Sequence, residues 1–336
     1  MREGLKHPRG PIRALSSSIN PRFEGSTMMA RSVAFPTRLA LIGFGEVGQM
    51  LARELACETR EISVFDIAFD DPQSAQSQEA PSLGVLARDS AAAAVAEAEV
   101  VISAVTARSA IEAACSVAPH LSPEAFFLDL NSVAPGTKRK AFQIISEGRG
   151  RFVEAAVMAP IYPKRLGTPM LLGGPHAVAF RTIAENLGFN VSVFSDRVGS
   201  ASAVKMCRSV MVKGLEALSM ECLAAARRAG VEAEVIASLS ESFPGLDWRG
   251  MAAYNLERMS THGIRRAAEM HEAARTVAEL GVEPLMALAT AQHQATMGGL
   301  RLKEECGGRV PEELEGILDA IVRLDPWPQA IGDAAE

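Results

Sequence analysis

The chain has 336 residues, of which 48% are hydrophobic and 22% are charged. This hydrophobic content excludes a disordered chain, and the length suffices for about two domains with large buried cores. The 40 acidic and 34 basic residues give a net charge of −6, which argues against nucleic-acid binding because such proteins carry a basic surplus. No segment is apolar over a length that would predict a membrane-spanning helix.

The cysteines indicate a reducing environment. The five cysteines are scattered along the chain and form no C-x-x-C pair. An odd, unpaired set predicts free thiols in a cytoplasmic protein, with neither a disulfide framework nor a metal site.

Residues 1–36 differ in composition from the rest of the chain. The first 27 residues contain five basic and only two acidic side chains. Prolines and a run of three serines interrupt any periodic pattern there. We expect a disordered tail, or sequence upstream of a start at Met28 or Met29. A transit peptide is the weaker alternative, since proline and glycine break an amphipathic helix.

The first predicted element is an apolar strand at 38–42, followed by a glycine-rich segment and then a helix. The segment consists of Gly43, Phe44, Gly45, Glu46, Val47 and Gly48. This G-x-G-x-x-G order between strand and helix predicts a dinucleotide site. Gly43 would allow the tight turn, Gly45 the approach of a pyrophosphate, and Gly48 the packing of the helix, whose N-terminus would hold the phosphates.

A second predicted strand, 61–65, ends at Asp66, which lies 18 residues after Gly48. A carboxylate at this spacing binds a ribose 2′-hydroxyl and repels a 2′-phosphate. Because no arginine follows closely, the sequence predicts NAD as the preferred cofactor and leaves NADP open. The alternative is that Asp66 only begins a turn in an acidic loop.

Strands and helices continue to alternate after Asp66. Further strands are predicted at 84–86, 99–105, 125–130, 151–157 and 191–194, with an alanine-rich helix at 90–98. The alternation predicts an α/β fold with a doubly wound parallel Rossmann sheet, whose ligands bind at the carboxyl ends of the strands. We therefore expect the nicotinamide beside Val105 and Thr106.

The strand pattern stops after about residue 197. Helices are predicted over 199–230, 232–242, 251–261 and 264–280, with another after Pro284. His262 and Gly263 are expected to cap the break between two of these helices, with proton transfer by His262 as the alternative. The chain thus divides into a tail (1–36), a Rossmann domain (37–197) and an all-helical substrate and dimerisation domain (198–336).

Two further segments complete the pattern. One runs Asp129-Leu130-Asn131-Ser132-Val133-Ala134-Pro135 directly after a predicted strand, and the other runs from Gly199 to Ser209 and contains Lys205. Together with the glycine-rich segment, their order resembles that of the β-hydroxyacid dehydrogenase superfamily, which includes 3-hydroxyisobutyrate and 6-phosphogluconate dehydrogenases. The resemblance covers about residues 38–298, and the helical half is similar to the C-terminal domain labelled "phosphogluconate dehydrogenase, NAD-binding".

This resemblance implies roles for several residues. Lys205 falls on the family's catalytic lysine, which exchanges a proton with the substrate hydroxyl. Asn131 and Ser132 fall on the loop that binds the substrate, although a turn capped by these side chains is the alternative. Ser209 stands where the family usually has asparagine, so Arg208 is expected to supply recognition of substrate charge instead.

Departures from the family pattern leave the substrate open. The family's Ser-Gly-Gly is replaced by Met158-Ala159-Pro160, and proline removes one backbone donor. The family's Lys-Asp pair falls on Ala268-Glu269, just after Arg265 and Arg266. Either arginine could clamp an anionic group, or both could belong to an ordinary charged helix face.

The sequence therefore predicts an NAD(P)-dependent dehydrogenase that transfers hydride between a nicotinamide and the CH–OH group of a small anionic 3-hydroxy acid or sugar acid. An imine or oxo-acid reductase and an oxidative decarboxylase are alternatives on the same fold. A non-catalytic NAD(H)-binding protein is the alternative of a different class. The resemblance also implies a homodimer, and we expect no nucleic-acid or membrane partner.

Overall fold

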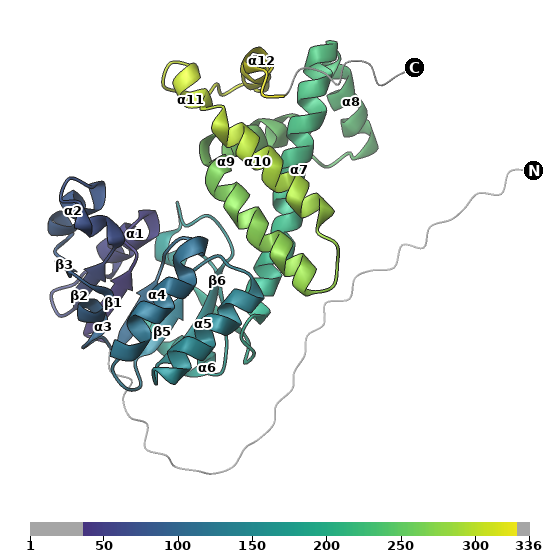
Figure 1. Ribbon diagram of the computed structural model, residues 1–336. Helices are drawn as coiled ribbons and strands as arrows, with labels where there is room; N and C mark the ends of the chain where they lie inside the picture. Colours follow the sequence, from purple (N-terminus) through teal and green to yellow (C-terminus); the bar gives the residue numbers. More distant parts are fainter. Residues whose placement is uncertain (1–35, 328–336) are drawn as a thin grey trace, which may run out of the picture. The chain divides into compact units, whose positions relative to one another are not determined.

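The structure, a computed structural model, describes residues 36–327. The predicted tail, except its last residue, lies outside the described residues, as do residues 328–336. Strands occupy the N-terminal part of the described chain, and the remainder is helical (Figure 1). None of the helices within this range is both long enough and apolar enough to cross a membrane.

Within the described residues, eight strands form one sheet in the order β3-β2-β1-β4-β5-β6-β7-β8. The strands are β1 (Arg38–Ile42), β2 (Glu61–Phe65), β3 (Leu86–Ala87), β4 (Val100–Ser103), β5 (Phe126–Asp129), β6 (Arg151–Val157), β7 (Met170–Gly173) and β8 (Val191–Ser195). All neighbours pair in parallel except β6 and β7. The predicted Rossmann-type sheet is therefore confirmed, with one antiparallel pair.

β7 is the strand that the sequence pattern did not predict. It has four residues, runs antiparallel to β6 and places Met170 and Leu172 in the core. Pro169 precedes it and Gly173-Gly174 ends it, so the short apolar run resembles a loop. The sheet is consequently mostly parallel, and β6–β7 is its one antiparallel pair among the described strands.

Helices cover both faces of the sheet. They are α1 (Glu46–Leu55), α2 (Ala75–Glu79), α3 (Ala91–Val95), α4 (Ala110–Val117), α5 (Pro135–Glu147) and α6 (Ala177–Asn186). Alternate residues of β1 enter two different apolar cores: Leu39 and Leu41 pack on the side of α1 and α6, whereas Ala40 and Ile42 pack on the side of α3, α4 and α5. Burial on both faces explains why these strands have continuous apolar sequences.

The C-terminal part of the described chain is helical. Its helices are α7 (Ser200–Ala229), α8 (Glu232–Ser242), α9 (Trp248–Glu279), α10 (Leu285–Gly299), α11 (Leu302–Glu305) and α12 (Leu314–Leu324). The predicted helices 199–230 and 232–242 agree with α7 and α8 to within one residue at each end. An apolar core that includes Met220, Leu256 and Ile317 joins α7, α9 and α12.

α9 corrects the predicted helix break at His262 and Gly263. It is one 32-residue helix that passes through both residues. A Cβ atom on Gly263 would lie 2.3 Å from the carbonyl oxygen of Gln294 and 2.6 Å from the nitrogen of Gly298, both on α10. The glycine therefore permits the close packing of two helices and does not end one.

Candidate active site

The glycine-rich loop lies between β1 and α1, at the carboxyl end of β1. Gly43 has φ +97°, and a Cβ atom there would lie 2.6 Å from the carbonyl oxygen of Ala104. On Gly48 it would lie 2.1 Å from the carbonyl oxygen of Gly43, whereas on Gly45 it would meet no atom within 4 Å. No side chain caps the N-terminus of α1, so the first N–H groups of this helix remain available beside the open space at Gly45. These residues fit the pyrophosphate of a dinucleotide.

The other loop residues face different surroundings. The Phe44 side chain is fully buried and lies near Phe69, with 5.8 Å between ring centroids, so only its backbone remains at the loop surface. Val47 packs partly against the same core. Glu46 is about half exposed at the first residue of α1.

Asp66 connects the end of β2 to the glycine-rich loop. Its carboxylate accepts hydrogen bonds from the backbone N–H groups of Phe44 at 2.6 Å and Ala68 at 2.9 Å. The second bond caps the 3-10 turn 67–70, so Asp66 does begin a turn. A carboxylate accepts about four hydrogen bonds, and lone pairs therefore remain for ribose hydroxyls.

The loops after β4 and β5 meet because these strands pair in parallel, with Ser103 opposite Asp129. Asn131 is buried, and its Oδ1 accepts the Val105 N–H at 2.8 Å while its Nδ2 donates to the Ser103 Oγ at 3.0 Å. Its polar atoms thus hold the two loops together. Thr106, the next residue after Val105, is exposed.

A buried ion pair supports the β5 loop. Lys138 and Asp129 are each 1% exposed, and the Lys138 Nζ lies 3.0 Å from the Asp129 Oδ1. The same carboxylate oxygen accepts the Asn131 N–H at 2.9 Å. The loop that carries Asn131 and Ser132 is therefore fixed from within the Rossmann part.

Lys205 and Ser132, two of the predicted site residues, are in direct contact. The half-buried Lys205 on α7 donates from its Nζ to the Ser132 Oγ at 2.5 Å. Burial lowers the pKa of Lys205 to about 8, because the ammonium loses hydration. Glu269 opposes this shift, and nearby Lys213, Lys138 and Arg265 add to it. A lysine with this pKa exchanges protons near neutral pH.

Lys213 and Glu269 form a second charged pair beside Lys205. The buried Lys213 Nζ lies 3.1 Å from the Glu269 Oε2 and donates to the Ser209 Oγ at 3.3 Å. Burial opposes ionisation of Glu269, but Lys213, Lys205 and Arg265 outweigh it, so the pKa of Glu269 is lowered. Sequence reasoning missed Lys213, although Lys205, Ser209 and Lys213 follow at four-residue spacing, which places them along one helix face.

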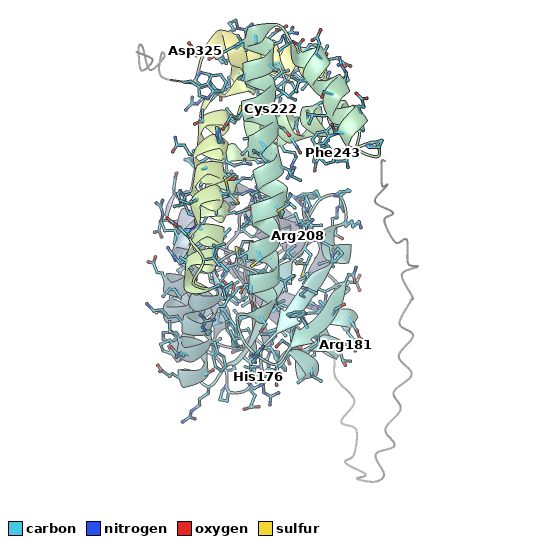
Figure 2. All side chains as sticks on the ribbon, turned by 90° about the vertical axis from the view of Figure 1, so that its right-hand side faces the viewer. His176, Arg181, Arg208, Cys222, Phe243 and Asp325 are labelled. Atoms are coloured by element: carbon cyan, nitrogen blue, oxygen red, sulfur yellow. The ribbon has the colours of Figure 1, made fainter. Side chains whose placement is uncertain are left out.

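The three arginines that were predicted to bind an anionic group lie in different surroundings. Arg208 is exposed on α7 (Figure 2). The Arg265 Nη1 lies 3.4 Å from the Glu46 Oε2, and its Nε lies 3.9 Å from the Glu269 Oε1, so Arg265 reaches the site. Arg266 is buried among the helices, where its Nε and Nη2 donate to Glu216. The structure therefore does not bring Arg266 to the site.

Glu154 anchors the helix that carries Lys205, and the sequence analysis did not select it. It is fully buried in β6, and its two carboxylate oxygens accept the N–H groups of Gly199 and Ser202, both at 2.6 Å. A carboxylate at this place caps the positive end of α7. An acidic residue inside the apolar strand 151–157 was the available signal.

Two glutamates of α9 cap α5, which begins just after Ser132. The Glu272 Oε2 accepts the Ala134 N–H at 2.8 Å, and the Glu279 Oε2 accepts the Gly136 N–H at 2.9 Å. The loop that contacts Lys205 is thus held from the helical side as well.

His262 lies on α9 near the same charges. Burial lowers its pKa, and the charges of Arg258 and Arg265 lower it further against Glu257 and Glu46. A histidine with a lowered pKa is neutral at pH 7. Because α9 continues through it, His262 does not cap a helix end.

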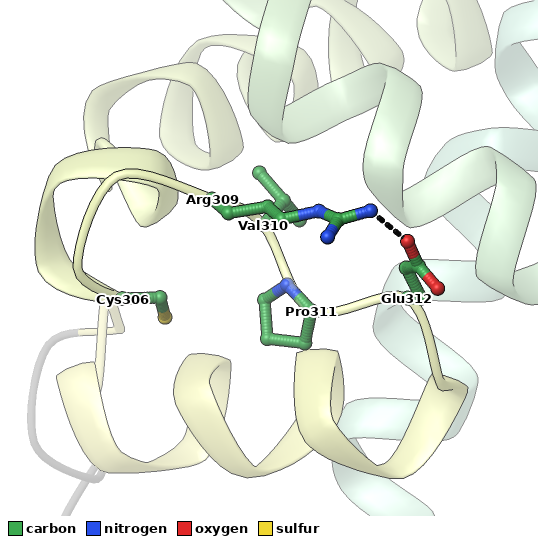
Figure 3. Close-up of a pocket in the computed structure, with 5 residues that line it drawn as sticks. All are labelled: Cys306, Arg309, Val310, Pro311 and Glu312. Atoms are coloured by element: carbon green, nitrogen blue, oxygen red, sulfur yellow. Dashed lines mark hydrogen bonds and ion pairs between the residues drawn. The ribbon is translucent and has the colours of Figure 1, made fainter.

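A pocket of about 370 Å³ lies apart from these residues. It is lined by Cys306, Arg309, Val310, Pro311 and Glu312, all from the segment between α11 and α12 (Figure 3). Arg309 and Glu312 form an ion pair on its wall. None of the predicted site residues lines this pocket, so it is not part of the candidate active site.

Two family models match separate parts of the chain. Residues 38–192 match the family described as "NAD binding domain of 6-phosphogluconate dehydrogenase". Residues 226–297 match the family described as "Domain of unknown function (DUF1932)". The first match contains the glycine-rich loop, Asp66 and the β4 and β5 loops, which supports a nicotinamide cofactor.

Related proteins extend over most of the chain. A conserved hypothetical protein from Sinorhizobium meliloti 1021 is 39% identical, with 86% of this chain and 96% of that chain covered and a TM-score of 0.69. The conserved protein MTH1747, described as structurally similar to 3-hydroxyacid dehydrogenases, is 32% identical, with coverage of 79% and 98% and a TM-score of 0.63. The 3-hydroxyisobutyrate dehydrogenase of Pseudomonas aeruginosa is 26% identical over 220 residues, which are 63% of this chain and 72% of that enzyme.

These similarities support oxidoreductase activity on a small-molecule substrate. They also agree with the fold. The chain belongs to the superfamily of NAD(P)-dependent 3-hydroxyacid dehydrogenases that includes 3-hydroxyisobutyrate and 6-phosphogluconate dehydrogenases.

Proposed function

We propose that this protein is an NAD-dependent dehydrogenase of a small anionic 3-hydroxy acid or sugar acid, with Lys205 as its general acid and base. The observation that carries the proposal is the contact of Lys205 with Ser132, 2.5 Å from Nζ to Oγ, beside the β4 and β5 loops. In this superfamily a bound nicotinamide supplies or accepts the hydride. The remaining steps concern groups of this chain.

The cofactor would be held by the carboxyl end of the sheet. The loop 43–48 would bind the pyrophosphate, Asp66 the ribose, and the backbone around Val105 and Thr106 would adjoin the nicotinamide. We propose NAD over NADP because the Asp66 carboxylate, followed by Asp70 and Asp71, repels a 2′-phosphate.

Lys205 would move the proton of the substrate hydroxyl. In the oxidation direction its neutral amine accepts this proton while the carbon-bound hydrogen leaves as hydride, which yields an oxo acid. In the reverse direction the ammonium returns the proton to the oxygen. Ser132 would orient Lys205 and hydrogen-bond the same oxygen, because its hydroxyl both donates and accepts.

The charges around Lys205 favour an anionic substrate. Lys205, Lys213 and Arg265 surround Glu269, and Arg265 also contacts Glu46, so three cations meet two carboxylates and positive charge is in excess there. Arg265 is 53% exposed beside Lys205 and Glu269, and we therefore propose it as the anion-binding arginine. Asn131 would act by hydrogen-bonding the β4 loop to the β5 loop. Ser209 would act by accepting a hydrogen bond from Lys213.

The protonation state of Lys205 also suits the reverse reaction, reduction. A pKa of about 8 leaves Lys205 mainly as the ammonium at pH 7, the form that donates a proton to an oxo or imino acid. Reduction of such a substrate is therefore the second candidate. An oxidative decarboxylase would use the same residues.

The test is nicotinamide absorbance during turnover with NAD and NADP over a panel of 3-hydroxy, sugar and oxo acids. We expect Lys205→Ala to lower kcat at least about 100-fold and to leave the Kd of NADH unchanged. Lys303→Ala, an exposed lysine on α11, is the control. Equal turnover of both variants would remove Lys205 from the mechanism, and tight NADH binding without turnover of any acid would indicate a non-catalytic protein.

We also propose the domain division 37–197 and 198–336, a homodimer and a cytoplasmic location. The division is supported by the end of β8 at Ser195 and the start of α7 at Ser200. Exposed apolar side chains on α7 and α10 support the homodimer. Four exposed cysteine thiols support a reducing compartment.

A further inference from the structure

An ion pair joins the glycine-rich loop to the helical part of the chain. The Arg265 Nη1 lies 3.4 Å from the Glu46 Oε2, although the two residues are 219 positions apart in the sequence. Glu46 is the first residue of α1, the helix whose free N–H groups fit the pyrophosphate of a dinucleotide. A guanidinium group from α9 therefore lies within one side-chain length of the place where the phosphates would bind.

The carboxylate of Glu46 is unfavourable for a bound pyrophosphate unless a cation accompanies it. In the first turn of a helix, a carboxylate competes with the phosphates for the positive end of the helix dipole and repels them. Arg265 neutralises this charge. Its guanidinium carries five N–H donors, so it can contact Glu46 and still donate to a phosphate oxygen. The ion pair is thus compatible with a bound dinucleotide, whereas Glu46 alone would oppose its binding.

α9 presents a basic face to this loop. Arg258, His262 and Arg265 are spaced four and three residues apart, which places them on one face of the helix. The pKa of His262 is lowered first by burial and then by the charges of Arg258 and Arg265. The Glu46 carboxylate opposes this shift, so it lies close enough to act on His262 as well. α9 also packs beside the turn 107–109, which follows β4.

The path of the cofactor leads past Arg265. A dinucleotide bound as described would run from the glycine-rich loop to the β4 loop, where Lys205 lies nearby. Arg265 contacts Glu46 at the first end of this path, and its Nε lies 3.9 Å from the Glu269 Oε1 at the second. We propose that Arg265, positioned by Glu46, closes over the pyrophosphate of the bound cofactor and must move away before the cofactor is released.

This inference rests on the dinucleotide site of the proposed function and adds to it a contact from the helical part. It is compatible with the proposed contact between Arg265 and the substrate anion. The Nη1 of Arg265 faces the loop and its Nε faces Glu269, so different N–H groups would serve the two ligands. Release of the cofactor would require that the Arg265 side chain leave Glu46.

The test measures the binding and release rates of NADH on the full-length chain by stopped-flow fluorescence. We expect Arg265→Gln to raise the release rate and the Kd of NADH at least about tenfold, because a charge-assisted contact with the phosphates is lost. An arginine that served the substrate alone would leave both values unchanged. Glu54→Gln is the matched control, because Glu54 pairs with Arg165 and lies at the opposite end of α1.

Glu46→Gln distinguishes positioning of Arg265 from simple repulsion of the phosphates by the sign of its effect. If Glu46 only repelled the phosphates, the variant would release NADH more slowly than the wild type. Because Glu46 positions Arg265, we expect release to be about threefold faster, a modest change since the ion pair is exposed. In the Arg265→Gln background, the same substitution should instead slow release, because only the repulsion is then removed.

Three results would contradict parts of this inference. An unchanged release rate in Arg265→Gln would overturn the contact with the pyrophosphate and leave the proposed function standing. Slower release from Glu46→Gln in the wild-type background would overturn the positioning role of Glu46. A wild-type chain that binds neither NADH nor NADPH would overturn the dinucleotide site, and with it the proposed function. Both side chains are more than half exposed, so thermal melting should show that each variant is folded.

Discussion

At the scale of single residues, Lys205 determines how the reaction depends on pH. Its pKa of about 8 lies below the ordinary value because burial destabilises the ammonium. Oxidation needs the neutral amine, so its kcat/KM should rise with pH and level off above about pH 8. Reduction needs the ammonium and should decline over the same range. Rates in both directions from about pH 6 to 10 test this, and a flat oxidation profile would contradict it.

Glu269 and Lys213 should move this profile in opposite directions. The Glu269 carboxylate raises the pKa of Lys205, and the Lys213 ammonium lowers it. Glu269→Gln should therefore shift the rise in oxidation rate to lower pH, whereas Lys213→Met should shift it to higher pH. The two variants serve as controls for each other. Shifts of the same sign would show that general damage to the site, not charge, causes the effect.

The four-residue spacing of Lys205, Ser209 and Lys213 was visible in the sequence, but their contacts were not. Arg265 and Arg266 illustrate why spacing in the sequence does not predict the contacts of a side chain. The two arginines are adjacent, yet successive helix residues point about 100° apart, so one reaches Glu46 and the other enters the helical core. Sequence pattern predicts a helix face and cannot determine which of two neighbours faces the site.

At the scale of elements, the position of α7 depends on Glu154. Glu154→Gln would place an amide group against one of the two N–H donors that the carboxylate accepts. We expect a loss of about 1–3 kcal/mol in the free energy of unfolding and a lower kcat, because Lys205 shifts with α7. Urea denaturation and turnover measure the two effects. Glu241→Gln on α8 is the control, and unchanged stability of the Glu154 variant would contradict the cap.

Gly263 and Gly214 offer a matched pair of helix glycines. Alanine at either position favours a helix by up to about 1 kcal/mol. At 263 the added Cβ would collide with α10, whereas at 214 the nearest atom is 3.9 Å away. Gly263→Ala should therefore lower the Tm, by the equivalent of about 1–3 kcal/mol, and Gly214→Ala should keep or raise it. A raised Tm for both would contradict the close packing of α9 on α10.

Elements with a strong local pattern were predictable from the sequence. The bounds of β1, β2, β6 and α8 follow from their apolar spacing and from the residues that end them. β7 and the continuity of α9 were not predictable, for a shared reason. The short β7 is stabilised by pairing with β6 and β8, and Gly263 is required by α10, so in both cases a distant segment overrides the local pattern.

At the scale of the whole described chain, the Rossmann part and the helical part each supply carboxylates that cap the N-termini of helices in the other part. Glu154 of β6 caps α7, and Glu272 and Glu279 of α9 cap α5. Neither set of N–H donors would keep these partners if the other part unfolded. The sequence shows the two parts as separate patterns and gives no sign of this exchange, because each acid and its donors lie at least 45 residues apart.

This exchange of caps has a consequence for thermal unfolding. Melting of the helices would strip the caps from α5, and melting of the sheet would strip the cap from α7, so neither part retains its stability alone. Calorimetry should accordingly record one endotherm, with equal calorimetric and van't Hoff enthalpies for a fixed oligomeric state. A dinucleotide that touched only the sheet would then shift the entire endotherm upward and not split it in two.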